Sequence, residues 1–176
     1  MNIESILLNH RSKLEIQRLI NYLIEHPENI HELMSILMNE ELSNIHYRAA
    51  WVLGYLSPLG NEAFSEYLDF LLLSLEKQNN HPTITRSITR LFQELNLPEK
   101  HHARLINISF DILTSEKQEL AQRANSMTIL YNYSKKYPDI QVELKLVIQE
   151  ILEYKKEASI QSRGKKVLQQ LRKNSV

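Results

Sequence analysis

Apolar side chains recur along the chain every three or four residues, which is the spacing of one face of an α-helix. One such stripe, in the last third of the chain, consists of Ile140, Leu144, Val147, Ile148 and Ile151. All five prolines stand where we expect a helix to begin, at Pro27, Pro58, Pro82, Pro98 and Pro138. Proline is tolerated in a first helical turn, where its missing N–H needs no partner. The pattern predicts helix nearly throughout and no strand.

The helical stretches predict ten helices in five pairs, joined by short connections. The expected ranges are 3–9 with 13–26, 28–39 with 44–56, 60–77 with 82–95, 98–114 with 118–136, and 138–155 with 158–173. Short connections make neighbouring helices antiparallel, and no such hairpin can bury its apolar face alone. A chain of hairpins therefore predicts a solenoid, in which each pair packs against the next.

An internal repeat supports this architecture. The second helix of four pairs carries an arginine followed by a small residue, at Arg48-Ala49, Arg86-Ser87, Arg123-Ala124 and Arg163-Gly164. The intervals of 38, 37 and 40 residues approach the period of about 40–47 residues of HEAT and armadillo arrays. We predict an all-α, right-handed α-α superhelix of about five hairpins, a single domain over residues 1–176. We expect the small residues to lie where paired helices approach closely.

Three stretches carry a family resemblance: 47–53 (YRAAWVL), 125–131 (NSMTILY) and 142–146 (VELKL). In these the chain resembles small bacterial HEAT- or armadillo-like helical-repeat proteins without an assigned function, and the resemblance covers most of its length. Some of those proteins carry an adenylosuccinate lyase label. That enzyme class uses a mobile loop rich in Ser, Gly, Met and Lys, and no segment of this sequence is like it.

Composition narrows the function classes. The chain has 21 basic and 21 acidic residues, so it is no polycation, although the end of the chain from Lys155 is strongly basic. It has no cysteine, which excludes disulfides and thiolate metal sites and fits a reducing compartment. With three glycines, the glycine-rich phosphate-binding motifs do not occur. No apolar run reaches the roughly 20 residues of a membrane span, and we expect a cytoplasmic protein.

The repeat register also defines a stripe on the second helices, formed by the positions one before, three after and seven after each arginine. In the first pair Arg18 can be placed in this register, although Leu19 follows it. It is largely polar in four pairs, so we expect it to face solvent there. Its members in those pairs are Gln17, Asn21, Glu25, Thr85, Thr89, Gln93, Gln122, Ser126, Leu130, Ser162, Lys166 and Gln170. Second helices line the concave surface of HEAT-like arrays, so the resemblance implies that this stripe is the inner groove.

In the second pair the stripe is aromatic instead, with Tyr47, Trp51 and Tyr55 beside Arg48. Exposed aromatic clusters with an arginine are typical binding hot spots. Two interpretations stay open: the rings form a partner-binding surface, or they pack against a neighbouring helix. The arginines have a structural alternative too, since they can bridge repeats or bond helix ends. Lys166, on the stripe of the last pair, joins the candidate partner-binding residues.

No catalytic or metal site can be assembled from the sequence. His101 and His102 are adjacent and point to different helix faces, and no HExxH motif occurs. We therefore predict a non-catalytic interaction or scaffold module, without cofactor, that binds a protein or peptide in its groove and no membrane. The alternative is a nucleic-acid-binding or DNA-repair HEAT-like protein, in which the rings would stack on bases and the basic last helix would meet phosphates.

Overall fold

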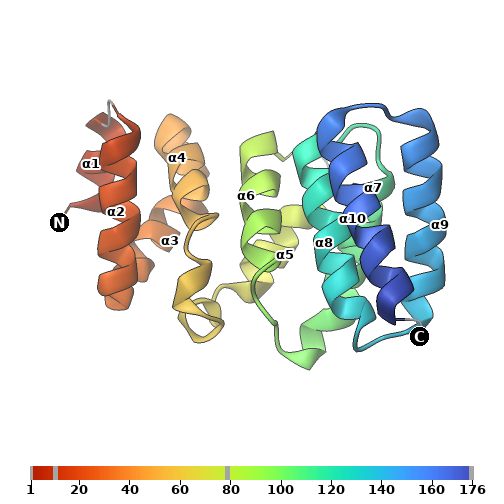
Figure 1. Cartoon of the computed structure of the whole chain (residues 1–176). Helices are drawn as coiled ribbons and strands as arrows, with labels where there is room; N and C mark the ends of the chain where they lie inside the picture. The colour runs from red at the N-terminus through yellow and green to blue at the C-terminus, as the bar shows by residue number, and fades with distance from the viewer. Residues whose placement is uncertain (1, 10–11, 78–79, 175–176) are drawn as a thin grey trace. The chain divides into compact units, whose positions relative to one another are not determined.

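Helices form along the chain as the apolar spacing predicts (Figure 1). The computed structural model describes residues 2–9, 12–77 and 80–174. Its helices are α1 (Ile3–Asn9), α2 (Lys13–Glu25), α3 (Ile30–Met38), α4 (Ser43–Leu53), α5 (Leu68–Glu76), α6 (Pro82–Phe92), α7 (His102–Thr114), α8 (Leu120–Ser134), α9 (Asp139–Tyr154) and α10 (Ala158–Asn174). No strand occurs among the described residues, and none of the helices found there is long and apolar enough to span a membrane. The all-α prediction is confirmed.

One helix, α5, begins eight residues later than predicted. The sequence pattern suggested a helix over 60–77, but α5 starts at Leu68. Gly60 has a φ of 75° after a short 3₁₀ turn, a left-handed conformation that interrupts a helix. The side-chain amide of Asn61 then donates to the carbonyl of Asn96, and a further 3₁₀ turn buries the ring of Phe64. The apolar side chain that suggested a helix here is therefore buried by a turn.

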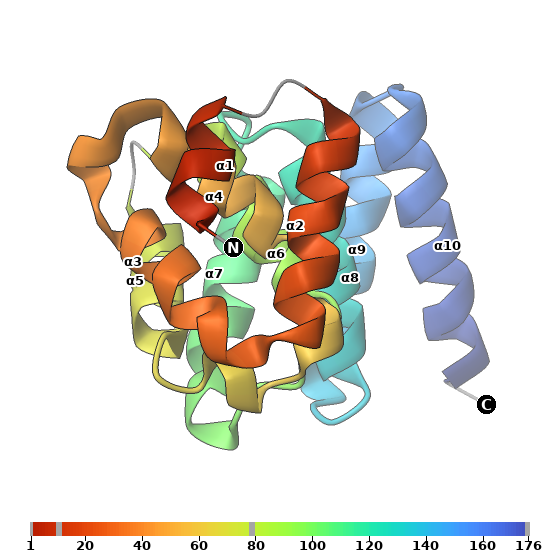
Figure 2. The ribbon, with the colours of Figure 1, turned by 90° about the vertical axis from the view of Figure 1, so that its left-hand side faces the viewer.

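The chain divides into two compact units, Met1–Asn96 and Leu97–Val176. In the first, α4 packs against α1, α3 and α6 (Figure 2). In the second, α8 packs against α7, α9 and α10 (Figure 1). The predicted partners α3/α4, α5/α6, α7/α8 and α9/α10 are in contact, which confirms the hairpin organisation. A single domain over residues 1–176 and the hand of the superhelix stay predictions.

The helix ends show how the chain manages with few glycines. The last turn of an α-helix leaves carbonyls without an intrahelical donor, and a left-handed glycine often closes it. Gly60 is the one glycine with a positive φ, and it follows a 3₁₀ turn. Side-chain N–H groups serve the ends of α1, α5, α7, α8 and α9: Arg48 donates to Leu7 and Leu8, Asn80 to Ser74, Arg123 to Leu113, Gln141 to Ser134, and Gln161 to Leu152 and Lys155.

The small residues after the arginines are buried: Ala49, Ser87, Ala124 and Gly164. A Cβ atom on Gly164 would stand 2.8 Å from Cδ2 of Leu152 and 3.1 Å from Cγ2 of Ile148, so α10 lies tightly on α9 here. A Cβ atom on Gly54 would stand 3.2 Å from Cα of Ser87, so α6 lies close to the end of α4. The prediction of close approach between paired helices is confirmed at Gly164. The close contact of Ser87 joins α6 to the end of α4 in the preceding hairpin instead of to its partner α5.

We predict that Gly164→Leu destabilises the fold by about 1–3 kcal/mol, because the new side chain must displace Leu152 and Ile148. Leucine has a higher helix propensity than glycine, which stabilises the variant by up to about 1 kcal/mol. The predicted loss is what remains after this gain is subtracted from the steric cost. Ser159→Leu is the control, since it adds the same side chain at an exposed position of α10. Urea unfolding followed by circular dichroism measures both variants. Equal midpoints for the two would show that α10 does not approach α9 closely at this residue.

Candidate functional site

The predicted aromatic row lies on the outward side of α4. The inward side is closed in the core, where Ala49, Ala50, Val52 and Leu53 have no accessible surface. Tyr47 and Trp51 lie on α4 and Tyr55 lies two residues past its end, each one helical turn from the next. All three side chains are half-buried. The structure therefore falls between the two open interpretations, because the rings are packed along part of their surface and reach solvent with the rest.

Each ring of the row has a partner within the first unit. Tyr47 stacks on His81, with ring centroids 3.9 Å apart and an angle of 25° between the planes. Trp51 and Tyr55 meet edge to face, with centroids 6.1 Å apart and planes at 89°. Cζ of Arg90 lies 3.9 Å from the centroid of the Tyr55 ring, a cation–π geometry. We call Tyr47, Trp51, Tyr55, His81 and Arg90 together the α4/α6 aromatic surface.

Sequence reasoning missed the two residues that α6 contributes to this surface. His81 is the N-cap of α6 and Arg90 lies in its last turn, and both are exposed. They reach the row only because α4 packs against α6, which no spacing within one helix reveals. The available signal was compositional, since α6 contains arginines and no acidic residue.

Arg48 is engaged with the fold rather than with the rings. Its Nη1 donates to the carbonyl oxygens of Leu7, at 2.6 Å, and Leu8, at 3.0 Å, in the last turn of α1. At the other end of α1, Oε1 of Glu32 accepts a hydrogen bond of 3.0 Å from the N–H of Ile3. The two charges complement the helix dipole. They hold a seven-residue helix that is too short to be stable alone, which supports the structural interpretation of Arg48.

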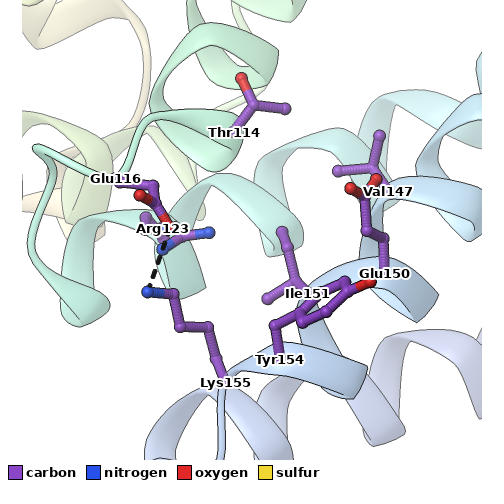
Figure 3. Close-up of a pocket in the computed structure, with 8 residues that line it drawn as sticks. All are labelled: Thr114, Glu116, Arg123, Val147, Glu150, Ile151, Tyr154 and Lys155. Carbon is purple, nitrogen blue, oxygen red and sulfur yellow. Dashed lines mark ion pairs between the residues drawn. The ribbon is translucent and has the colours of Figure 1, made fainter.

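A pocket of about 300 Å³ lies in the second unit, where α7 ends, α8 begins and α9 ends (Figure 3). It is lined by Thr114, Glu116, Arg123, Val147, Glu150, Ile151, Tyr154 and Lys155. Nζ of Lys155 lies 3.3 Å from Oε1 of Glu116. None of the predicted partner-binding residues lines this pocket. Among the described residues, no group of three His, Asp or Glu side chains is arranged to hold a metal ion.

A family model of the HEAT repeat domain matches residues 3–171 of the chain. The chain belongs to the HEAT-repeat family. Comparison with curated proteins and with solved structures found no match. HEAT repeat domains commonly mediate protein interactions and are generally non-catalytic scaffolds. The membership agrees with the helical hairpins seen in both units.

The polar stripe of the HEAT repeats is not uniformly exposed, and this part of the sequence prediction is wrong. Its members are exposed in the first pair and largely so in the last, but Thr85, Thr89, Gln122, Ser126 and Leu130 are buried. The hydroxyl of Thr89 donates to the carbonyls of Thr85, at 2.8 Å, and Arg86, at 3.1 Å, of its own helix. Likewise Oε1 of Gln122 accepts from the N–H of Glu119 at the start of α8. A side chain that bonds its own helix can be buried without water.

Lys166 is exposed on α10, in the second unit of this HEAT-repeat chain. The charged neighbours on the same helix, Lys165, Arg172 and Lys173, are exposed as well. The other predicted partner-binding residues, Tyr47, Arg48, Trp51 and Tyr55, all belong to the first unit. The predicted set thus consists of one cluster in the first unit and a separate cationic helix in the second, and its role in binding stays a prediction.

We predict that Arg48→Met lowers the free energy of unfolding by about 1–3 kcal/mol, because it leaves two carbonyls at the end of α1 without their charged donor. Arg18→Met is the matched control, since Arg18 is exposed on α2 and its loss should change stability by no more than about 0.5 kcal/mol. Denaturant unfolding of both variants provides the comparison. If the two lose the same stability, Arg48 does not hold α1.

Proposed function

We propose that this HEAT-repeat chain is a non-catalytic interaction module that binds a protein or peptide segment on the α4/α6 aromatic surface. The observation that carries the proposal is the half-buried row of Tyr47, Trp51 and Tyr55, which is flanked by His81 and Arg90. Rings held in place by neighbours lose little entropy when a partner covers them. Tryptophan, tyrosine and arginine are also the residues that dominate binding hot spots.

The charges point to an acidic partner segment. The second helices of the last four pairs, α4, α6, α8 and α10, together contain nine basic residues and no acidic one, whereas α2, the second helix of the first pair, carries Glu15 and Glu25. On α6 the exposed cations are Arg86 and Arg90. A segment that places an apolar or aromatic side chain against Trp51 and a carboxylate near these arginines would complement the surface in both shape and charge.

The predicted residues Arg48 and Lys166 have different parts in this proposal. Arg48 stands beside the row and contributes positive potential to it, although its guanidinium is bonded to α1. Lys166, with the other exposed cations of α10, offers a separate contact for an acidic partner in the second unit. We further propose that the chain acts in the cytoplasm, in keeping with its lack of cysteine.

Nucleic-acid binding is the second candidate, and the cations of α10 favour it. Lys165, Lys166, Arg172 and Lys173 lie on one acid-free helix, and a phosphate backbone would attract such a helix. The first unit favours a protein partner, because the exposed cations of α6 are only Arg86 and Arg90, and the single cation of α4, Arg48, is half-buried. The balance of 21 basic and 21 acidic residues also gives no general attraction for a polyanion.

We predict that peptides selected from a random displayed library on the immobilised protein combine Asp or Glu with an aromatic or large apolar residue. Trp51→Ala should lower the affinity for the selected peptides at least about tenfold, as the loss of a hot-spot residue does. Fluorescence anisotropy of labelled peptides measures the affinity. Leu73→Ala is the control, since Leu73 is 53% exposed on α5, outside the α4/α6 aromatic surface, and it should leave the affinity unchanged.

The same titration with a short DNA duplex decides between the two candidates. Duplex binding that is strong at about 50 mM salt and lost by about 200 mM would support the nucleic-acid alternative. Trp51→Ala is checked by thermal melting at each step, because a half-buried ring contributes to stability. Peptides that bind Trp51→Ala and the parent equally well would overturn the proposal.

A further inference from the structure

Arg123 is a buried cation without a buried anion. Its side chain is 4% exposed, and its Nε donates to the carbonyl oxygen of Leu113 at 2.8 Å. Among the described residues it forms no ion pair with a carboxylate. A guanidinium has five N–H donors, and a buried charge that lacks a counter-charge is unfavourable. Arg123 also lines the pocket of the second unit, where a ligand can meet the donors of its guanidinium.

The pocket has a charged side and an apolar side (Figure 3). Arg123, Glu116 and Lys155 lie together on the first. Val147 and Ile151 of α9 form the second, with the ring of Tyr154 beside Ile151 and the side chain of Glu150 beside Val147. The volume of about 300 Å³ is at the lower end of the range for small-molecule sites. It suits a ligand with one charged group and a short apolar tail.

We propose that this pocket binds an organic monocarboxylate, with the carboxylate on the guanidinium of Arg123 and the tail against Val147 and Ile151. A planar carboxylate matches the guanidinium fork and supplies the missing counter-charge. Lys155 adds to the electrostatic attraction for the carboxylate, even though it forms an ion pair with Glu116. The site goes beyond the proposed function, because it lies in the second unit and uses none of the α4/α6 aromatic surface.

The two glutamates of the pocket select the charge of the ligand. Glu116 and Glu150 both line it and both are exposed, so each carboxylate repels an anion in the pocket by an amount that solvent reduces. A phosphate with two negative charges would be repelled by the glutamates about twice as strongly as a monocarboxylate. The single negative charge of a monocarboxylate is neutralised by Arg123 alone. The same chemistry occurs in a free short-chain acid and in the C-terminal carboxylate of a peptide that ends in an apolar residue.

The test is a titration of the full-length protein with five probes, monitored by two-dimensional amide NMR. The probes are 4-methylpentanoate as the free acid, N-acetyl-leucine as the peptide end, the primary amide of each as a neutral match, and inorganic phosphate. We expect an acid to bind at least about tenfold more tightly than its amide, with shifts centred on residues of α8 and α9. The tighter of the two acids identifies the source of the carboxylate.

Two variants place the site. Val147→Phe fills the apolar side of the pocket and should weaken the acid at least about tenfold. Val142→Phe makes the same change on α9 at a position that is 68% exposed and should leave binding unchanged. Arg123→Lys keeps the charge and removes the fork, so it should also weaken the acid. If Arg123→Lys fails to fold, the comparison of the two valine variants still decides.

Three results would overturn the proposal. An acid that binds no more tightly than its amide would show that the guanidinium is not the recognition group. Equal affinities in Val147→Phe and Val142→Phe would place the binding outside this pocket. Phosphate that binds as tightly as the acids would replace the monocarboxylate with a general anion.

Discussion

The carbonyl groups at the ends of the helices set the main constraint on this molecule. A stack of short helices has many ends, and each leaves carbonyls that need a donor or water. A chain with three glycines has little use of the left-handed glycine cap. Arginine, asparagine and glutamine side chains supply the donors instead, and several reach from a neighbouring helix. Each such bond ties two segments together while it closes a helix, so the helix ends also fix the packing.

This constraint explains why some residues recur at the same position of each repeat and why others depart from the repeat pattern. Arg48 and Arg123 recur in register and are used for the ends of α1 and α7. Trp51 breaks the register, since other repeats carry a polar side chain there, and it stays partly open to solvent. In a repeat protein the residues shared by the repeats stabilise the packing of one repeat on the next. A residue that differs from the repeat pattern can contact a partner without destabilising the other repeats.

The sequence allowed the helices and their pairing to be predicted, because apolar periodicity and proline positions report directly on local structure. Exposure was harder to predict. The polar side chain of Thr89 predicts a surface position, but its hydroxyl donates to carbonyls of its own helix and the residue is completely buried. Only the α4 part of the α4/α6 aromatic surface was predicted, because its rings are spaced along one helix. His81 and Arg90 contact these rings only because α6 packs against α4. The pocket around Arg123 needs the ends of three helices together, which no local pattern encodes.

The claim that Arg48 and Arg123 serve helix ends can be tested directly by NMR of the arginine side chains. In the structure, the Nε–H of Arg123 donates to the carbonyl of Leu113, whereas Arg172 is exposed on α10. We predict that the Nε–H of Arg123 exchanges with water much more slowly than that of Arg172 and shows a scalar coupling across the hydrogen bond to the Leu113 carbonyl carbon. Equally fast exchange of both, with no such coupling, would contradict the account.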